Sequence, residues 1–199
     1  MARVYAFTEK DLDRVKEFFK LKNKIVMYHM LSIGTNVALR ISDLTALRFE
    51  ELENYKNNKL VANITEKKTK KKRKVIFNSI CKKSLAELKK YYKSLGYDTN
   101  EGYIFKSMNR GYVKELYDKP ISKTGVNNYL NLAREYLDIQ YPIGSHSMRK
   151  TWGNRAYEKY EKIGLVSMAL GHSSERVTMK YLGIEEEDIL GLFEDLSVE

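Results

Sequence analysis

Apolar residues recur at helical spacing along most of this 199-residue chain, and one region departs clearly from that pattern. The segments Leu60–Ile64 and Val75–Phe77 are short and β-prone, and a run of basic residues separates them. Two such segments around a polar connection are typical of a hairpin. The sequence therefore predicts a mainly α fold with a small antiparallel β-hairpin, an α+β architecture.

Local signals place the helices. Thr8-Glu9-Lys10-Asp11 resembles a capping box, and a glycine follows several apolar stretches where a helix should end. Residues 97–121 give no clear signal. The expected helices cover residues 8–20, 23–33, 79–93, 145–160, 163–170 and 174–182, with a short one capped at 42–45, another marked by Val126, Leu130, Ala133 and Leu137, and breaks at Gly164, Gly171 and Gly183.

Charge is the unusual part of the composition. The net charge is +10, and because residues 182–199 hold seven acidic residues and no Lys or Arg, residues 1–181 carry +17. Such a basic body favours a polyanionic partner, with nucleic acid ahead of a membrane. The single cysteine, Cys81, excludes an internal disulfide, and no apolar run is long enough for a membrane span. We expect one domain over residues 1–199, acting in a reducing cytoplasm.

His146 and Arg149 are three residues apart on an expected helix, so their side chains share one face and can reach the same phosphate. The spacing alone is weak, because His-x-x-Arg occurs by chance on many solvated helices. A second histidine, His172, follows Leu170-Gly171, where the glycine would expose it; a buried structural histidine is the rival interpretation. His29 lies in an apolar helix and is expected in the core.

Tyr181 comes nine residues after His172. It is one of 15 tyrosines, so the alternative is an ordinary half-buried aromatic. Val177, one helical turn earlier, could pack inward while Tyr181 points into a cleft. A tyrosine hydroxyl is able to attack phosphorus, and nearby histidines suit proton transfer because they titrate near neutral pH.

Arg40 is expected in the turn before the short helix at 42–45, with Asp43 three residues later. A carboxylate at that position could fix the guanidinium and leave its other donors for a phosphate. Alternatively the two form a simple surface salt bridge. With Arg149, Arg40 would supply two arginines for the non-bridging oxygens of one phosphate.

Seven of the eight residues from 67 to 74 are basic. The simplest interpretation is a solvated charged face. At a hairpin tip, however, such residues could follow a DNA groove and bring one lysine to a leaving oxygen. The expected DNA contacts are Lys67, Lys70, Lys71, Lys72, Arg73, Lys74 and, beside Arg149, Lys150. The residues alone do not select the catalytic lysine.

Three motifs together resemble the tyrosine recombinases, the family of phage and transposon integrases. They are the stretch from Gly34 to Leu44 around Arg40, the His-x-x-Arg box at 145–151, and Leu-Gly-His-Ser-Ser at 170–174 followed by Tyr181. The resemblance covers most of the chain. It implies the catalytic-domain fold of this family and selects Lys68 as the catalytic lysine, with Lys67 and Lys70 as competitors.

The resemblance implies site-specific DNA recombination through a 3′-phosphotyrosyl link, without a metal or ATP. Tyr181 would attack the scissile phosphate, Arg40 and Arg149 would stabilise the transition state, and Lys68 would protonate the 5′-oxygen. His146 would assist the tyrosine, and His172 would donate a hydrogen bond to the phosphate. The partner would be double-stranded DNA, bound by a homo-oligomer, specifically a tetramer, whereas a monomer is compatible with the DNA-free state.

Members of this family usually carry a helical domain before the catalytic one, and here about seven residues precede the first expected helix. That core-binding domain is expected to be absent, so the chain is either a fragment or a stand-alone catalytic domain. In residues 182–199, an apolar stripe amid acidic residues predicts a tail helix. It would fold onto its own body or dock on a neighbouring protomer.

Two other functions remain open on these residues. A type IB topoisomerase resembles the recombinases in residues and chemistry, and strand exchange between duplexes separates the two. A DNA-binding accessory protein could keep the fold without cleaving DNA. Formation of a covalent adduct distinguishes that protein from an enzyme.

Overall fold

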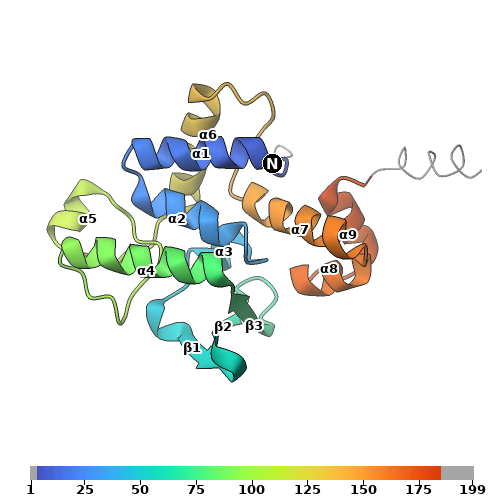
Figure 1. Cartoon of the computed structure of the whole chain (residues 1–199), viewed down its shortest axis with the longest axis horizontal. Coiled ribbons are helices and arrows are strands. Elements are labelled where there is room, and N and C mark those ends of the chain that lie inside the picture. Colours follow the sequence, from blue (N-terminus) through green and yellow to red (C-terminus); the bar gives the residue numbers. More distant parts are fainter. Residues whose placement is uncertain (1–3, 185–199) are drawn as a thin grey trace, which may run out of the picture. The chain divides into compact units, whose positions relative to one another are not determined.

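The computed structural model describes residues 4–184, so residues 185–199 of the expected tail helix lie outside the described part. The chain divides into two compact units, Met1–Trp152 and Gly153–Glu199 (Figure 1). The division falls within one helix, α7 (Ser147–Tyr160). The sequence-based fold class is confirmed, since helices dominate and the strands form one small antiparallel sheet.

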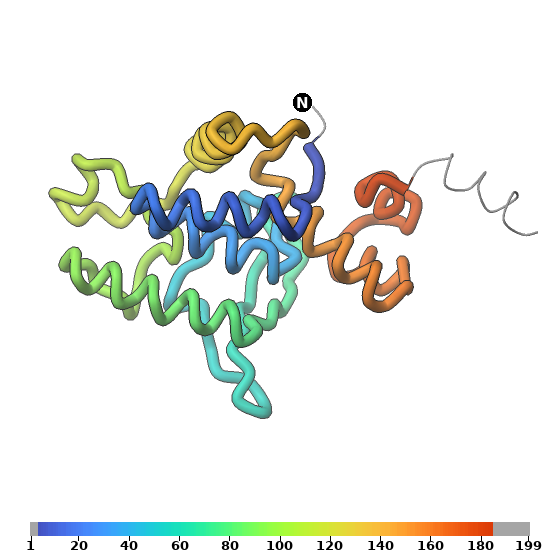
Figure 2. The backbone as a smooth tube through the Cα atoms, turned by 45° about the horizontal axis from the view of Figure 1, so that its top comes forward, coloured from blue at the N-terminus to red at the C-terminus, as the bar shows by residue number. Residues whose placement is uncertain are grey.

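An apolar helix forms the centre of the first unit. Helix α2 (Ile25–Gly34) lies between α1 (Glu9–Leu21) and α4 (Ser79–Ser94), as Figures 1 and 2 show. Because neighbours cover α2, its residues Met30, Leu31 and Ile33 are fully buried. The N-cap part of the capping-box prediction for α1 is confirmed, because the Thr8 hydroxyl accepts a hydrogen bond from the backbone N–H of Asp11. The reciprocal bond of a capping box is replaced, since the Thr8 N–H donates to the Tyr141 hydroxyl.

The sheet has three antiparallel strands in the order β1 (Leu52–Tyr55), β2 (Lys59–Thr65) and β3 (Lys72–Phe77). The 3-10 turns at Phe49–Glu51 and Lys56–Asn58 precede and follow β1. The sequence predicts the β2–β3 hairpin but not β1, whose mostly exposed polar residues give no alternating pattern. The sheet end that holds the β1–β2 connection projects from the helices in Figure 2.

Thr65 pairs with Lys72 in the last rung of the β2–β3 ladder, so the hairpin turn consists of residues 66–71. The strand β3 therefore begins inside the basic run, and Lys72, Arg73 and Lys74 are strand residues rather than tip residues. Lys70 adopts a left-handed conformation with φ of 58°, which lets six residues close the turn.

Residues 97–121, which gave no sequence signal, form an irregular segment with one short helix, α5 (Arg110–Lys114). Polar contacts rather than an apolar repeat hold this segment. The Tyr92 hydroxyl donates to the Ile104 carbonyl over 2.8 Å, and the buried Lys106 ammonium pairs with Asp118. Helix α6 (Lys123–Tyr136) follows, and its inner face buries Val126, Leu130 and Ala133 as the spacing predicts.

The second unit contains the end of α7, then α8 (Ile163–Leu170) and α9 (Glu175–Leu182). Gly171 and Gly183 end α8 and α9 in left-handed conformations, with φ of 60° and 91°, as the glycine signals predict. Gly164 is different, because it lies inside α8 and ends no helix.

Candidate active site

Arg149 lies in the first turn of α7 and is almost fully buried, with 2% of its surface exposed. Its Nη1 donates a 2.7 Å hydrogen bond to the carbonyl oxygen of Ala38. A buried guanidinium needs partners for its donors, and a backbone carbonyl supplies one without cancelling the charge. The side chain is therefore held in one orientation while it keeps its positive charge.

Arg40 is the N-cap residue of the short helix α3 (Ile41–Leu44) and has an extended backbone. The sequence predicts Asp43 as the partner of its guanidinium, either fixing it for a phosphate or forming a simple salt bridge. The structure instead pairs Arg40 Nη1 with Glu66 Oε2 at 2.6 Å, and Asp43 Oδ1 accepts the backbone N–H of Lys67 at 3.0 Å. Glu66 directly follows β2, so the carboxylate that pairs with Arg40 comes from the end of that strand, whereas Asp43 on α3 binds the backbone of the next residue, Lys67.

His146 lies in the turn that leads into α7. The sequence predicts a helix from residue 145, whereas the helix in the structure begins at Ser147, one residue after His146. Its carbonyl oxygen accepts the first helical hydrogen bond, from the N–H of Lys150 at 3.0 Å. The preceding Ser145 N–H donates to the Asn127 side chain on α6. The turn is thus tied both to α7 and to α6.

Burial lowers the pKa of His146 below its usual value, and positive charges on Lys123, Arg149, Lys150 and Arg40 lower it further. This effect places Arg40 and Arg149, which both belong to the first unit, within electrostatic reach of His146. At neutral pH the imidazole is therefore neutral and able to accept a proton.

The basic residues between 67 and 74 lie in two different environments. Lys67, Lys68, Lys70 and Lys71 are exposed. The expected DNA contact Arg73, by contrast, is half-buried, and its Nη1 pairs with Glu66 Oε1 at 2.9 Å. On the same strand, Lys74 lies 3.7 Å from the centre of the Tyr55 ring and 3.6 Å from a Glu53 oxygen. The basic run is therefore divided between a solvated turn and a partly paired strand.

The second unit contains the other two predicted residues, His172 and Tyr181, whose ring centres lie 5.0 Å apart at an angle of 76°. His172 Nδ1 is 2.9 Å from the hydroxyl oxygen of Thr178. Thr178 is fully buried, whereas Val177 is 45% exposed. The expectation that Val177 anchors α9 is wrong, since its polar neighbour occupies the inner position.

Three residues that sequence analysis did not single out contact or influence this set: Glu66, Lys123 and Thr178. Glu66 had a usable signal, because it is an acidic residue directly before a stretch of eight residues of which seven are basic. Lys123 and Thr178 had none, since nothing in their local sequence distinguishes them from other surface and helix residues.

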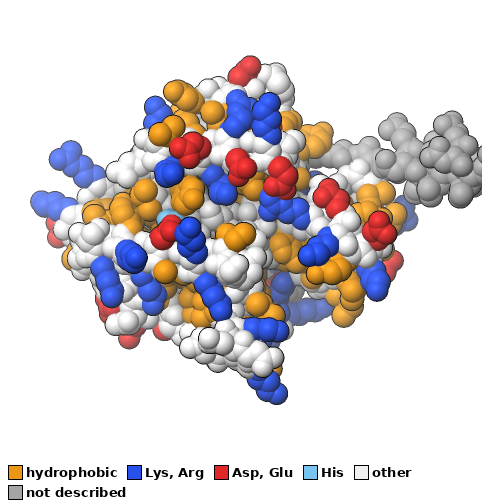
Figure 3. Space-filling model, viewed as in Figure 1, with side chains coloured by type: hydrophobic (Ala, Val, Ile, Leu, Met, Phe, Trp, Pro, Cys, Tyr) orange, Lys and Arg blue, Asp and Glu red, His pale blue; other side chains and the backbone are white. Residues whose placement is uncertain are grey.

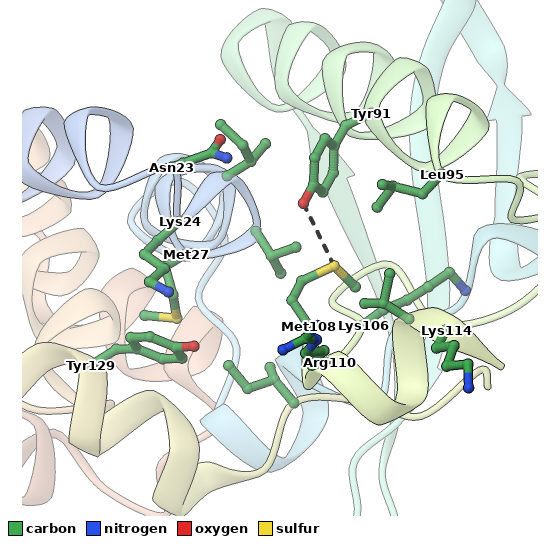
Figure 4. A pocket seen from close by; sticks show the side chains of 14 residues that line it. Asn23, Lys24, Met27, Tyr91, Leu95, Lys106, Met108, Arg110, Lys114 and Tyr129 are labelled. Atoms are coloured by element: carbon green, nitrogen blue, oxygen red, sulfur yellow. Dashed lines mark hydrogen bonds between the residues drawn. The ribbon is translucent and has the colours of Figure 1, made fainter. Parts of the chain in front are cut away.

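A pocket of about 440 Å³ lies elsewhere in the first unit, between the start of α2, the end of α4, the segment around α5, and Tyr129 of α6 (Figure 4). The Tyr91 hydroxyl contacts the Met108 sulfur in its wall at 3.8 Å. None of the predicted site residues lines it. The prediction that His29 is a core residue is confirmed, and burial raises the pKa of the Cys81 thiol to about 12, so this cysteine is unreactive.

Lys and Arg side chains are spread over the face shown in Figure 3, including the edge formed by the sheet. Along residues 4–184, every helix is too short or too polar to cross a bilayer. The surface charge thus agrees with the polyanionic partner expected from the composition.

The fold is that of tyrosine recombinase catalytic domains. The structure superposes on the XerA recombinase with a TM-score of 0.70 at 20% identity, covering 99% of this chain and 65% of that one. The XerH site-specific recombinase bound to difH substrate also gives 0.70, at 15% identity, covering 95% of this chain and 52% of that one. This chain therefore spans about two thirds or less of those solved chains.

The sequence itself matches the phage integrase family model over residues 6–187. It is also 35% identical over 176 residues to a probable integrase/recombinase, YoeC, of Bacillus subtilis (strain 168), covering 88% of this chain and 87% of YoeC. The chain belongs to the phage integrase family.

Proposed function

We propose that this protein is a site-specific DNA recombinase that cuts and rejoins DNA strands through a 3′-phosphotyrosyl intermediate. Family membership supports an integrase/recombinase activity on DNA. The observation that carries the assignment of residues is the electrostatic link of His146 to both Arg40 and Arg149. Two guanidinium groups beside a neutral imidazole suit an anionic phosphate whose attacking hydroxyl must lose a proton.

In this proposal the Tyr181 oxygen attacks the scissile phosphorus, and its proton passes to His146 or to water. Arg40 and Arg149 bind the non-bridging oxygens, where negative charge increases in the transition state. The bond from phosphorus to the 5′-oxygen breaks, and Lys68 donates a proton to that oxygen. The new bond joins the tyrosine oxygen to the 3′-phosphate.

His172 would donate a hydrogen bond to the same phosphate. Rejoining reverses these steps when a 5′-hydroxyl of a second DNA end attacks the phosphotyrosine. Every step exchanges one phosphate ester for another, so the bond energy is conserved and the residues themselves supply the acid, the base and the charge.

The finer assembly is part of the proposal. Residues 1–199 would act as one catalytic domain in the cytoplasm and form a tetramer on DNA, with the acidic tail at 182–199 docking on a neighbouring protomer. Deleting residues 185–199 tests the tail, with DNA-bound oligomers measured by native mass spectrometry. If the deletion leaves the oligomers unchanged, the tail has no such role.

The main test isolates the wild-type protein and a Tyr181→Phe variant from cells under denaturing conditions and sequences any DNA that remains attached. We expect adducts at one sequence with the wild type and none with the variant. Purified wild type incubated with two duplexes of the recovered sequence should then produce recombinant strands.

The outcomes separate the rival functions. Relaxation of a supercoiled plasmid at many sequences, without recombinant strands, would favour a topoisomerase. Salt-sensitive DNA binding with no adduct from the wild type would favour an accessory DNA-binding protein. An adduct formed equally by Tyr181→Phe would exclude Tyr181 as the nucleophile.

A further inference from the structure

Glu66 is a buried carboxylate at the start of a strongly basic turn. It directly follows β2 and has 1% of its surface exposed, although Lys67 and Lys68 beside it are solvated. Burying a carboxylate costs free energy unless hydrogen-bonding partners replace the lost water. The hydrogen bonds that offset this cost show which side chains Glu66 orients.

Three side chains contact the Glu66 carboxylate. Oε2 accepts from Arg40 Nη1 and from Thr69 Oγ1, each at 2.6 Å, and Oε1 accepts from Arg73 Nη1 at 2.9 Å. Burial by itself raises the pKa of Glu66, but hydrogen bonds from Thr69, Arg73 and Arg40 outweigh it and hold the pKa below its usual value. The group is therefore ionised at neutral pH, and one negative charge orients two guanidinium groups without cancelling both.

The same residue closes the turn that carries Lys68. The backbone N–H of Glu66 donates to the Lys71 carbonyl at 3.0 Å, and the Lys70 N–H donates to the Glu66 carbonyl at 2.9 Å. Lys68 therefore lies between two fixed neighbours, because the Lys67 N–H is bound to Asp43 and the Thr69 hydroxyl is bound to Glu66. Its side chain reaches solvent from a turn whose backbone is held on both sides.

We propose that Glu66 is a positioning residue, whose buried carboxylate fixes the position of the Lys68 turn relative to the Arg40 guanidinium. The inference rests on the proposed function, in which Arg40 binds the phosphate and Lys68 protonates the leaving oxygen. Glu66 itself is too buried to contact DNA. The competing role is purely structural, in which the carboxylate stabilises the sheet and has no specific effect on proton donation.

A sulfur substitution separates the two roles. Two duplexes carry the target sequence recovered by adduct mapping, one with the natural 5′-oxygen at the scissile phosphate and one with a bridging 5′-sulfur. A thiol is far more acidic than an alcohol, so the sulfur leaves as a thiolate and needs no proton from Lys68. The readout is the ratio of adduct formation rates, sulfur over oxygen, at a single turnover.

Lys68→Ala calibrates the experiment, because loss of the general acid should raise this ratio by about a hundredfold or more. For Glu66→Gln we expect the oxygen rate to fall about tenfold or more and the ratio to rise about threefold or more, since hydrogen bonds to a charged group are lost. Glu53→Gln is the matched control: it neutralises an exposed carboxylate in the same sheet and should leave both rates unchanged.

An unchanged ratio in Glu66→Gln, with both rates lowered together, would overturn the inference, because a structural role predicts that result. If Glu66→Gln does not fold, Thr69→Val removes the turn contact alone and should still raise the ratio, whereas an unchanged ratio there also overturns it. Failure of the wild type to form an adduct with either duplex would count against the proposed function instead.

Discussion

His172 Nδ1 lies 2.9 Å from the Thr178 hydroxyl oxygen, and the two residues belong to the same small unit. The Thr178 hydroxyl is also 3.4 Å from the carbonyl oxygen of Ser174. The hydroxyl has one proton: if it donates to the Ser174 carbonyl, Nδ1 of a neutral His172 ring carries the ring proton, and if it donates to Nδ1, the ring proton is on Nε2. The proposed hydrogen bond from His172 to the phosphate needs an Nε2–H group, so it needs the second arrangement, in which Thr178 donates to Nδ1.

Thr178→Val keeps the shape of the side chain and removes the hydroxyl. We expect adduct formation to slow by about fivefold, because a hydrogen bond of about 1 kcal/mol no longer orients the ring. Thr178→Ser keeps the hydroxyl and should retain most of the rate. The measurement is the single-turnover cleavage rate of both variants, and a valine variant as fast as the serine variant would contradict the expectation.

Arg149 offers a test of charge against geometry. Arg149→Lys keeps a positive charge, but a single ammonium cannot reproduce a guanidinium that bonds the Ala38 carbonyl and, in the proposed function, a phosphate at the same time. We expect cleavage to fall about a hundredfold, as for removal of one transition-state donor, while the fold is retained. The measurement is the rate of adduct formation, with urea unfolding as the control for the fold. A lysine variant with full activity would exclude the need for a guanidinium at this position.

Two histidines predict how stability depends on pH. Burial lowers the pKa of both His29 and His146 in the folded chain, with Glu87 partly opposing the effect at His29. In the unfolded chain both titrate near 6.5, so below that pH the unfolded state binds more protons. Stability should therefore be complete above about pH 6.5 and fall as the pH drops toward the folded pKa values.

The check is the melting temperature between about pH 7.5 and 5.5, a range above the titration of ordinary carboxylates. His29→Leu removes one of the two groups without touching the proposed site, and its melting temperature should vary less across this range. A steeper dependence than that of the wild type would show that other groups dominate.

The solvated turn should govern the salt dependence of DNA binding. Lys71→Ala removes one exposed charge, and we expect the slope of log affinity against log salt to decrease in magnitude by about one. Lys71→Arg retains the charge and should leave the slope unchanged. Fluorescence anisotropy at several salt concentrations gives both slopes, and equal slopes for the two variants would exclude a phosphate contact at this position.

Periodicity and glycine signals predicted most helices of the fold, because α1, α4, α6 and α8 each bury one regular apolar face or end at a marked residue. The segment at residues 97–121 escaped prediction for a physical reason. It is held by the Tyr92 hydroxyl and by Lys106 with Asp118, partners that are distant in sequence and leave no local pattern.

The candidate site shows the same limit. Motifs identified Arg40, His146 and Arg149, and the structure brings these three within electrostatic reach. The partner of Arg40 could not be deduced, because Asp43 and Glu66 are both plausible from composition and only the path of β2 selects Glu66. Thr178 was missed because an inward-facing polar residue on a helix looks like any exposed one.

The Ala38 carbonyl holds Arg149, and Arg40 follows two residues later, so three consecutive residues determine the spacing between the two guanidinium groups. Exposed loops between Arg40 and Arg149 can change in length without altering that spacing, provided that the end of β2 keeps Glu66 beside Arg40. A single insertion or deletion between Ala38 and Arg40 cannot be absorbed in this way. The backbone of residues 38–40 therefore sets the distance between the two arginines. We expect natural variation in this protein to preserve the length of this stretch more strictly than its side chains.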